Sequence, residues 1–492
     1  MFATILRSGI SFGTTLIVAR LLGPPDFGRM VFLLASFSAF KALLDMASSS
    51  AFFTFLSQRQ RSKKFVKYYF IWVLFQFFVS LVIVGLIIPS QTLLDLFKEE
   101  SKTLVLLALV ASFMQHHLWT ISSQYAEAFR QTIQIQSISL ILTLLHFVLV
   151  ISLWHFGILI LPVLFTFLIL EWSGASILAI RSCKFKNDYQ EIIQEDENPK
   201  TVFLEFWNYC LPFLPFAFMS FFYEFVDRWM LQHWGGATEQ AYYGVASRVS
   251  TIALLATTSI LKIFWKEIAE ANYLNNKVLV KNLYSKVSRL LFCAGALFVG
   301  ALLPWTEEII LMTLGVEYIG GVLTLGIMFI YPIHQSMGQI GGTMLLATEK
   351  ASLHIKIVLF FMVLSLAVSY FLQAPLSAPL PGLGLGSTGL AFKMVCIQIL
   401  QVNVIAFYIA KIYGIKFKFF YQFVCVLYTI SAGLISKYSF YDYFDSNILL
   451  KFSFSMMIYS IIILLTLFYF PVVLGVEKIN FRKLLSFSPN IN

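Results

Sequence analysis

The sequence predicts an all-α polytopic membrane protein with about fourteen transmembrane helices. Three observations lead to this fold class. The 492 residues are 59% hydrophobic and 12% charged, with a mean hydropathy of +0.81, which leaves too little charge to cover a water-soluble domain. Apolar runs of about 20 residues recur from end to end, each long enough to cross a hydrocarbon core of ~30 Å. Lysine and arginine gather in alternate connections between these runs, as in polytopic membrane proteins.

The apolar runs divide the chain into fourteen expected spans joined by polar connections. No cleavable signal peptide is expected, because Arg7 and Arg20 flank an apolar stretch without a small-residue cleavage site. In order, the spans cover residues 2–22, 28–57, 65–89, 103–129, 131–156, 158–181, 202–233, 238–268, 280–303, 320–347, 352–374, 386–411, 415–437 and 446–474.

The basic connections orient the spans. When the N-terminus is cytoplasmic, the cytoplasmic ends and loops hold most of the 35 Lys and Arg, whereas a miscounted span would reverse every later loop. We therefore expect both termini in the cytoplasm. Basic loops on anionic lipid explain the net charge of +10 without nucleic acid. The largest clusters follow the second span (Arg59, Arg61, Lys63, Lys64, Lys67) and the eighth (Lys262, Lys266, Lys277, Lys281, Lys286, Arg289).

Four parts are expected along the chain. Residues 1–181 form an N-terminal lobe of six spans, and residues 202–412 form a C-terminal lobe of six. A cytoplasmic linker at 182–201, which contains the acidic run EIIQEDE, joins the lobes. Residues 413–492 hold spans 13 and 14, two peripheral helices, and a cytoplasmic tail.

Two sequence matches indicate that the lobes are copies. The turn LGPPDFG at 22–28 resembles the segment that ends at Gly244, and the end of span 4 near Arg130 resembles the end of span 10 near Lys350. Both matches have nearly the same spacing. Because six is an even number of spans, the copies would be related by an axis along the membrane normal, with a shared cavity between them.

Several short motifs resemble one family of transporters. They are ARLLGPPDFG at 19–28, LDMA at 44–47, VDR at 226–228 and YGVASR at 243–248. In this order, with the span count and the two-lobe repeat, they resemble bacterial polysaccharide flippases. These are the O-antigen and capsule repeat-unit exporters of the multidrug/oligosaccharidyl-lipid/polysaccharide (MOP) superfamily. The resemblance covers essentially the whole chain, and one departure is Met46-Ala47, where a Leu-Gly pair would be more usual.

The resemblance implies a MATE-like fold and a flippase rather than an enzyme. The substrate would be an undecaprenyl-diphosphate-linked oligosaccharide, moved from the inner to the outer leaflet of the bacterial cytoplasmic membrane. Translocation would proceed by alternating access through a cationic cavity while the lipid tail stays in the bilayer. The product would serve surface polysaccharide biosynthesis, such as lipopolysaccharide or capsule, together with other assembly proteins.

Four basic residues inside the spans are candidates for binding the diphosphate: Arg248, Arg7, Lys41 and Lys393. A guanidinium suits phosphate because its planar fork offers paired donors. Three of them have an alternative role. Arg248 could form an ion pair with a neighbouring carboxylate, Arg7 could snorkel to headgroups, and Lys41 could pair along its helix.

Five further charges are candidates for cavity ion pairs or for coupling: Asp45, Glu171, Glu224, Asp227 and Arg228. Asp45 lies four residues after Lys41, and Glu224 four before Arg228, so both could form pairs along a helix. Glu224 and Asp227 could also pair with Arg248. Glu171, in the middle of span 6, could carry a proton or a sodium ion, or simply hydrogen-bond a neighbouring helix. Cofactors are not otherwise expected.

Polar side chains in the repeat-related spans 4 and 10 are candidates for sugar contacts: Gln115, His116, Gln124, Gln335 and Gln339. Such residues also hold helices together in membranes. No metal site is expected, because the adjacent His116 and His117 point about 100° apart on a helix.

Two rival functions are open. A cation-coupled multidrug exporter of the same superfamily would need an acidic cavity, yet most mid-span charges are basic. A membrane enzyme acting on a polyprenyl-linked glycan would be expected to carry a large outer loop, yet residues 304–320 and 373–386 form short ones. The motifs of an ATP-driven pump or a hydrolase are missing from the sequence.

Overall fold

The computed structural model describes residues 2–59, 61–98, 100–183, 198–416, 419–439 and 447–474. Within these ranges the chain folds into helices without a β-strand, as predicted. The α-helices are α1 (Phe2–Asp45), α2 (Ser48–Gln58), α3 (Lys63–Val82), α4 (Ser90–Phe97), α5 (Lys102–Ser112), α6 (Trp119–Ala128), α7 (Thr132–His155), α8 (Leu161–Ser182), α9 (Pro199–Cys210), α10 (Leu214–Met230), α11 (Gly236–Ile252), α12 (Leu255–Tyr273), α13 (Lys277–Leu302), α14 (Thr306–Thr313), α15 (Val322–Ala347), α16 (Ala351–Gln373), α17 (Gly386–Tyr413), α18 (Phe420–Tyr438) and α19 (Ile448–Tyr469).

Short turns of other helix types join or extend several of these helices. Among the described residues, π-helical turns are η1 (Ile83–Ile87), η2 (Phe113–Leu118) and η5 (Leu231–Gly235), and 3₁₀ turns are η4 (Leu211–Phe213), η6 (Leu303–Trp305), η7 (Val316–Gly321) and η9 (Pro471–Leu474).

Twelve helical segments of the described chain are long and apolar enough to cross a membrane. Two of them, Leu6–Asp45 and Pro199–Ile252, contain 40 and 54 residues. At 1.5 Å per residue they would span about 60 and 80 Å, at least twice a hydrocarbon core of ~30 Å. Each contains a break at a glycine, and dividing both segments there gives the predicted count of about fourteen spans.

The two glycine breaks have the same backbone conformation. Gly23 has φ 73° and ψ 168°, and Gly236 has φ 81° and ψ −176°. Glycine reaches this region readily, but a side chain would strain it. Pro24 and Pro25 follow the first break. They stand in the first turn of a helix, where a backbone N–H has no partner within the helix, so the missing N–H of proline costs no hydrogen bond. The equal conformations agree with the predicted internal repeat.

The ends of α6 and α15 are a second matched pair. Arg130 follows α6 and Glu349 follows α15, both with φ 61°. A left-handed residue of this kind lets later N–H groups bond the last free carbonyls of a helix. The closing hydrogen bonds run from Gln131 N to Ala126 O (3.0 Å) and from Lys350 N to Leu345 O (2.7 Å).

Two spans that were expected to be continuous are broken. The span expected at 28–57 stops at Asp45 and restarts as α2 at Ser48, and the span expected at 238–268 is divided between α11 and α12. At the first break Met46 and Ala47 have positive φ (43° and 66°), which is uncommon for residues with a side chain. The prediction of unbroken helices was wrong here because neither break contains the glycine or proline that usually marks the end of a helix.

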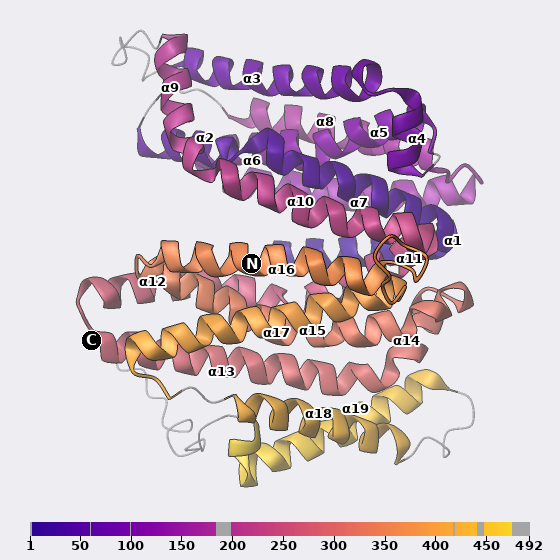
Figure 1. The fold of residues 1–492 in the computed structure, drawn as a ribbon, viewed down its shortest axis with the longest axis vertical. Helices are drawn as coiled ribbons and strands as arrows, with labels where there is room; N and C mark the ends of the chain where they lie inside the picture. The colour runs from indigo at the N-terminus through magenta and orange to yellow at the C-terminus, as the bar shows by residue number, and fades with distance from the viewer. Residues whose placement is uncertain are drawn as a thin grey trace. The chain divides into compact units, whose positions relative to one another are not determined.

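The helices gather into two compact units, residues 1–244 with 362–390 and residues 245–361 with 391–492. In the first unit α1 packs against α5, α7 and α10, and α8 packs against α5, α6 and α7. In the second unit α13 packs against α12, α15 and α18, and α18 packs against α19. Within each unit the long helices run nearly parallel or antiparallel (Figure 1).

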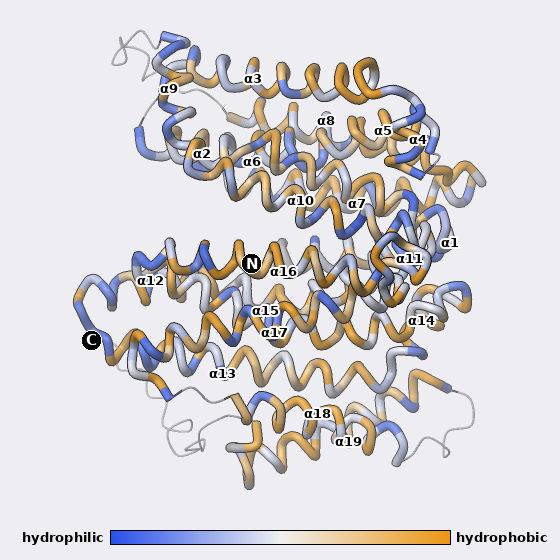
Figure 2. Tube along the Cα trace, viewed as in Figure 1, coloured by the Kyte–Doolittle hydropathy of each residue, from blue (hydrophilic) through white to orange (hydrophobic). Residues whose placement is uncertain are grey.

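Hydropathy follows this arrangement. Apolar residues dominate the lengths of the helices, and hydrophilic residues gather towards helix ends and connections (Figure 2). Many large apolar side chains are exposed, among them Leu86 (81%) and Phe78 (65%), as expected of surfaces that face lipid. The proposed division of the chain at a linker stays a prediction, and both the acidic run at 191–197 and the tail after 474 lie outside the described residues.

Candidate functional site

The break between α1 and α2 positions Asp45 at the start of α2. Its carboxylate accepts hydrogen bonds from Ser49 N (2.8 Å), Ser49 Oγ (2.7 Å) and Ser48 Oγ (3.2 Å). Ser48 Oγ also lies 3.3 Å from the hydroxyl of Tyr69 on α3. Asp45 therefore caps α2, and the positive end of that helix favours its negative charge.

A side chain of another helix bonds the carbonyl of Leu44 at this break. Gln76 Nε2 on α3 donates to Leu44 O at 2.5 Å. Gln76 Oε1 in turn lies 3.0 Å from His117 Nε2. His117 belongs to the π-helical turn η2, and such turns are frequent at functional sites. A buried polar chain thus links η2, α3 and the end of α1.

Lys41 lies one turn before the break and contacts a different helix. Its Nζ is 3.4 Å from Thr120 Oγ1 on α6. The described hydrogen bonds of Lys41 and Asp45 do not join the two residues. Lys41 and Asp45 were expected to pair with each other along the helix, but in the structure each has a different hydrogen-bond partner.

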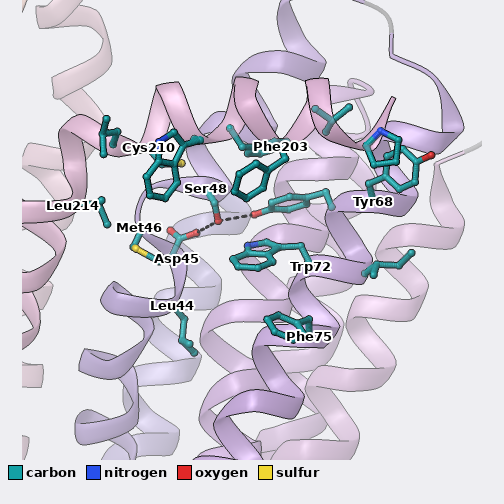
Figure 3. Close-up of a pocket in the computed structure, with 17 residues that line it drawn as sticks. Leu44, Asp45, Met46, Ser48, Tyr68, Trp72, Phe75, Phe203, Cys210 and Leu214 are labelled. Carbon is teal, nitrogen blue, oxygen red and sulfur yellow. Dashed lines mark hydrogen bonds between the residues drawn. The ribbon is translucent and has the colours of Figure 1, made fainter. Parts of the chain in front are cut away.

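An apolar pocket of about 520 Å³ opens beside Asp45. It lies between α3 and α9, and residues at the break between α1 and α2 form its base. Figure 3 shows Asp45 and Ser48 between Cys210 and Leu214 on one side and the rings of Tyr68, Trp72 and Phe203 on the other. The pocket is thus apolar over nearly all its surface, with the capping carboxylate at one edge.

Glu171 on α8 pairs with a histidine of the neighbouring helix. Its Oε2 lies 2.9 Å from His146 Nδ1 on α7, and the carboxylate side chain is 4% exposed. The other oxygen, Oε1, is buried without a hydrogen-bond partner. A buried carboxyl with one unused oxygen can accept a proton or contribute to a cation site.

Asp227 and Arg228 hold helices of the first unit together. Asp227 accepts a hydrogen bond of 2.6 Å from Ser369 Oγ on α16. The Arg228 guanidinium lies 4.6 Å from the ring centre of Tyr243 and 3.4 Å from Gln240 Oε1, both on α11. Gln240 Nε2 also donates to the Arg228 carbonyl. Arg228 thereby links α10 and α11 across the Gly236 break.

Glu224 lies one turn before Arg228 on α10, and its side chain is exposed. The described ion pairs of the chain do not include Glu224 and Arg228.

The basic candidates are divided between the two units. Arg7 and Lys41 lie on α1 in the first unit, and Arg248 on α11 and Lys393 on α17 lie in the second. Arg248 is exposed, whereas Lys393 is fully buried at 0%. Their convergence on one diphosphate stays a prediction.

The candidate sugar contacts are half-buried. Gln115 and His116 lie in η2 and Gln124 in α6, and Gln335 and Gln339 lie in α15. Gln124 Oε1 and Gln339 Oε1 are both buried without a hydrogen-bond partner. These matching unused acceptors occur in the two repeat-related helices, and their role in sugar binding stays a prediction.

The N-terminal half of the chain matches a known family. The model of the family described as polysaccharide biosynthesis protein matches residues 1–264, more than half of the sequence. The chain belongs to this family.

Solved structures with the same fold are transporters of the MOP superfamily. A structure titled lipid II flippase MurJ, inward closed conformation, has a TM-score of 0.70 and 14% identity, with 96% of this chain and 99% of that chain covered. Inward-facing and outward-facing structures of a multidrug resistance MATE family transporter have TM-scores of 0.52 and 0.51, at 14% and 15% identity. Each covers 84% of this chain, and 96% and 94% of its own. No curated protein sequence matches the chain.

This member of the polysaccharide biosynthesis family carries site residues that the sequence did not single out. Gln76 and His146 read as isolated polar residues in apolar runs, and their partners lie 32 and 25 positions away. Glu239, which accepts from Ser387 N at 2.6 Å and caps α17, lies 148 positions from its partner. The sequence shows that each of these polar residues lies inside an apolar span. It does not show which residue on another helix each of them bonds.

Proposed function

We propose that this protein is a flippase for undecaprenyl-diphosphate-linked oligosaccharide repeat units in the bacterial cytoplasmic membrane. The main support for this function is that the chain belongs to the polysaccharide biosynthesis family. The likeness of the fold to a lipid II flippase supports a lipid-linked sugar as substrate. The product supplies surface polysaccharide such as O-antigen or capsule, and the assembly enzymes of that pathway are the proposed partners.

The chemistry of the spans suits a diphosphate. Arg248, Arg7, Lys41 and Lys393 are cations within apolar helices, and a charge at membrane depth is costly unless it faces a partner or a wet cavity. A diphosphate would be such a partner, held by charge-assisted hydrogen bonds. The sugars would be held by glutamine side chains with unused acceptors, while the lipid remains in the bilayer.

The proposed mechanism is alternating access without a catalytic step. The breaks at Gly23, at Met46-Ala47 and at Gly236 are points where backbone angles can change while the helices on either side stay intact. A substrate that binds the two end states differently would shift their populations.

A leaflet assay tests the function. In a strain that lacks the protein, complete lipid-linked repeat units should accumulate in the inner leaflet, out of reach of an impermeant sugar-labelling reagent on sealed spheroplasts. Normal labelling with unchanged surface polysaccharide would contradict the proposal. Export of cationic drugs by the same protein would then favour the multidrug-exporter alternative, which the MATE-like fold leaves open.

Arg248 variants test the site. Arg248→Lys should keep part of the outer-leaflet labelling, because it retains a cation. Arg248→Gln should lose most of it, roughly tenfold or more, because charge-assisted bonds to phosphate contribute about 1.5–3 kcal/mol. Full labelling in the Gln variant at equal expression would remove Arg248 from the site.

A further inference from the structure

We propose that the pocket beside Asp45 binds a lipophilic organic cation whose charge is enclosed by apolar groups, such as a quaternary ammonium or phosphonium ion. This is the pocket of about 520 Å³ between α3 and α9, referred to below as the aromatic cage. All its lining residues belong to the first unit. Binding at this site does not depend on the transport function proposed above.

The aromatic cage has the size and the lining of a small-molecule site. Its volume falls within the range of about 300–1,000 Å³ that holds a drug-sized ligand. The exposed rings at the cage are 38% to 57% accessible, so a ligand can reach them; they are Trp72, Phe75, Phe203 and Trp207. Figure 3 shows the labelled rings of Trp72 and Phe203, from α3 and α9, to the same side of the Asp45 carboxylate.

The rings of the cage form stacked pairs within and between the two helices. The ring centre of Trp72 lies 5.6 Å from that of Phe75 on the same helix. Tyr69 on α3 stacks on Phe206 of α9, with ring centres 5.2 Å apart and planes 8° apart. The electron-rich face of an aromatic ring attracts a cation within about 6 Å, and sets of such rings recognise quaternary ammonium groups in other proteins.

Asp45 gives the cage a negative charge. Among the residues that line the cage, Asp45 carries a carboxylate and none is a lysine, arginine or histidine. The three described hydrogen bonds of the carboxylate come from neutral donors, Ser48 Oγ, Ser49 N and Ser49 Oγ. These donors leave the charge of Asp45 in place. A cation is therefore favoured over a neutral or anionic molecule of the same shape.

The hydrogen bonds of Asp45 also indicate the kind of cation. Both carboxylate oxygens already accept from Ser48 or Ser49, and the rest of the lining is almost entirely apolar. A primary ammonium would bring three N–H donors into surroundings with few acceptors, and an unmade hydrogen bond is costly. A quaternary ion carries its charge without an N–H group, so it loses no such bond on entry.

Basic residues near the cage do not line it. Lys41 is hydrogen-bonded to Thr120 on α6 at 3.4 Å, and Arg59 and Arg61 both bond Glu205 on α9. The lysines at the starts of α3 and α9 also lie outside the lining; they are Lys63, Lys64, Lys67 and Lys200. Water and salt screen exposed charges at a distance, whereas Asp45 borders the cage directly.

Two ions of equal shape and opposite charge test the cage. The full-length protein in a neutral detergent would be dialysed against tetraphenylphosphonium or against tetraphenylborate. The bound ion is measured after subtraction of binding to empty micelles. The cation should bind at roughly tenfold lower concentration than the anion, because the carboxylate and the ring faces attract the first and repel the second.

A charge variant tests the role of Asp45. Asp45→Asn should preserve the start of α2, because asparagine caps a helix about as well as aspartate does. It should weaken binding of the cation roughly tenfold and reduce the difference between the two ions. The matched control Asp95→Asn, which removes the same charge at an exposed position of α4, should leave binding unchanged.

An aromatic variant tests the walls of the cage. Trp72→Leu/Trp207→Leu keeps apolar side chains but removes two ring faces, and should weaken binding of the cation roughly tenfold. Its control is Trp154→Leu, an exposed position of α7 outside the cage, which should bind as the unchanged protein does.

Two results would overturn the proposal. They are equal binding of the two ions, and a loss of cation binding in Asp45→Asn no larger than that in Asp95→Asn. If the double tryptophan variant does not elute as a single folded species, the comparison of the aspartate variants still decides. Since the assay measures binding without transport, a failed flippase assay would leave it unaffected.

Discussion

The role of Asp45 in the structure differs from the role that its place in the sequence suggests. Its spacing from Lys41 suggests an ion pair along a helix, but the helix ends at Asp45 and the carboxylate bonds Ser48 and Ser49 at the start of α2. Each oxygen of the carboxylate is satisfied locally. Lys41 has Thr120 as its hydrogen-bond partner, which is compatible with a second role in substrate binding.

Ala47 is strained at this break, and a substitution should relieve the strain. Its φ of 66° costs a residue with a Cβ about 1–2 kcal/mol. Ala47→Gly should therefore stabilise the protein by about 0.5–1 kcal/mol after the extra entropy of the unfolded glycine is subtracted. Thermal unfolding in detergent measures this. The same change at Ala51, which lies inside α2, should destabilise, and equal effects at both positions would contradict the explanation.

Glu171 and His146 form a pair suited to coupling transport to protons. Glu171→Gln keeps a hydrogen-bonding side chain beside His146 but cannot carry a proton. We expect this variant to lose the dependence of substrate flipping on an imposed pH gradient. Reconstituted vesicles would measure it, with the exposed Glu307→Gln on α14 as control. Gradient dependence that persists in Glu171→Gln would exclude this pair as the coupling site.

At the scale of elements, two glycines allow α1 and α11 to cross closely. A Cβ at Gly28 would lie 1.7 Å from the carbonyl oxygen of Ala237, and a Cβ at Gly244 would lie 3.0 Å from Val31 Cγ1. These are the two glycines that the sequence repeat matches. Each of the two matched segments thus contributes one glycine to the same crossing within the first unit.

Gly28→Ala should force this crossing apart. A methyl group at 1.7 Å from a backbone oxygen cannot be relieved by a rotamer change, so we expect a loss of about 3 kcal/mol or failure to fold. Gly13→Ala on the same helix meets nothing within 4 Å and should be neutral or slightly stabilising. The yield of monodisperse protein and its midpoint of thermal unfolding compare the two. Similar behaviour of both variants would contradict the close crossing.

At the scale of the whole molecule, the distribution of charge predicts which connections face the cytoplasm. Position 266 lies at the end of the eighth span that is expected inside, on α12, and position 380 lies on a connection expected outside, where Leu380 is 70% exposed. Each would be replaced by cysteine. In a background without other cysteines, an impermeant maleimide should label position 380 in intact cells and position 266 only after lysis. The reverse pattern would invert the proposed topology.

The sequence by itself determined that this chain is a helical membrane protein and where most spans begin and end. Hydropathy and turn residues are local properties, and a span needs little more than about 20 apolar residues. The resemblance to polysaccharide flippases likewise rested on short ordered motifs, and the family match over residues 1–264 agrees with it.

Only the tertiary structure decided which polar groups meet. Glu171 was a sequence candidate, but its partner His146 was not, and Gln76 was assigned no role before Leu44 O and His117 were found beside it. The break at Met46-Ala47 was also hidden, because its residues are as apolar as the helices they separate. A polar side chain in an apolar span must find a partner, but that partner comes from another helix, and helix packing rather than local sequence chooses it.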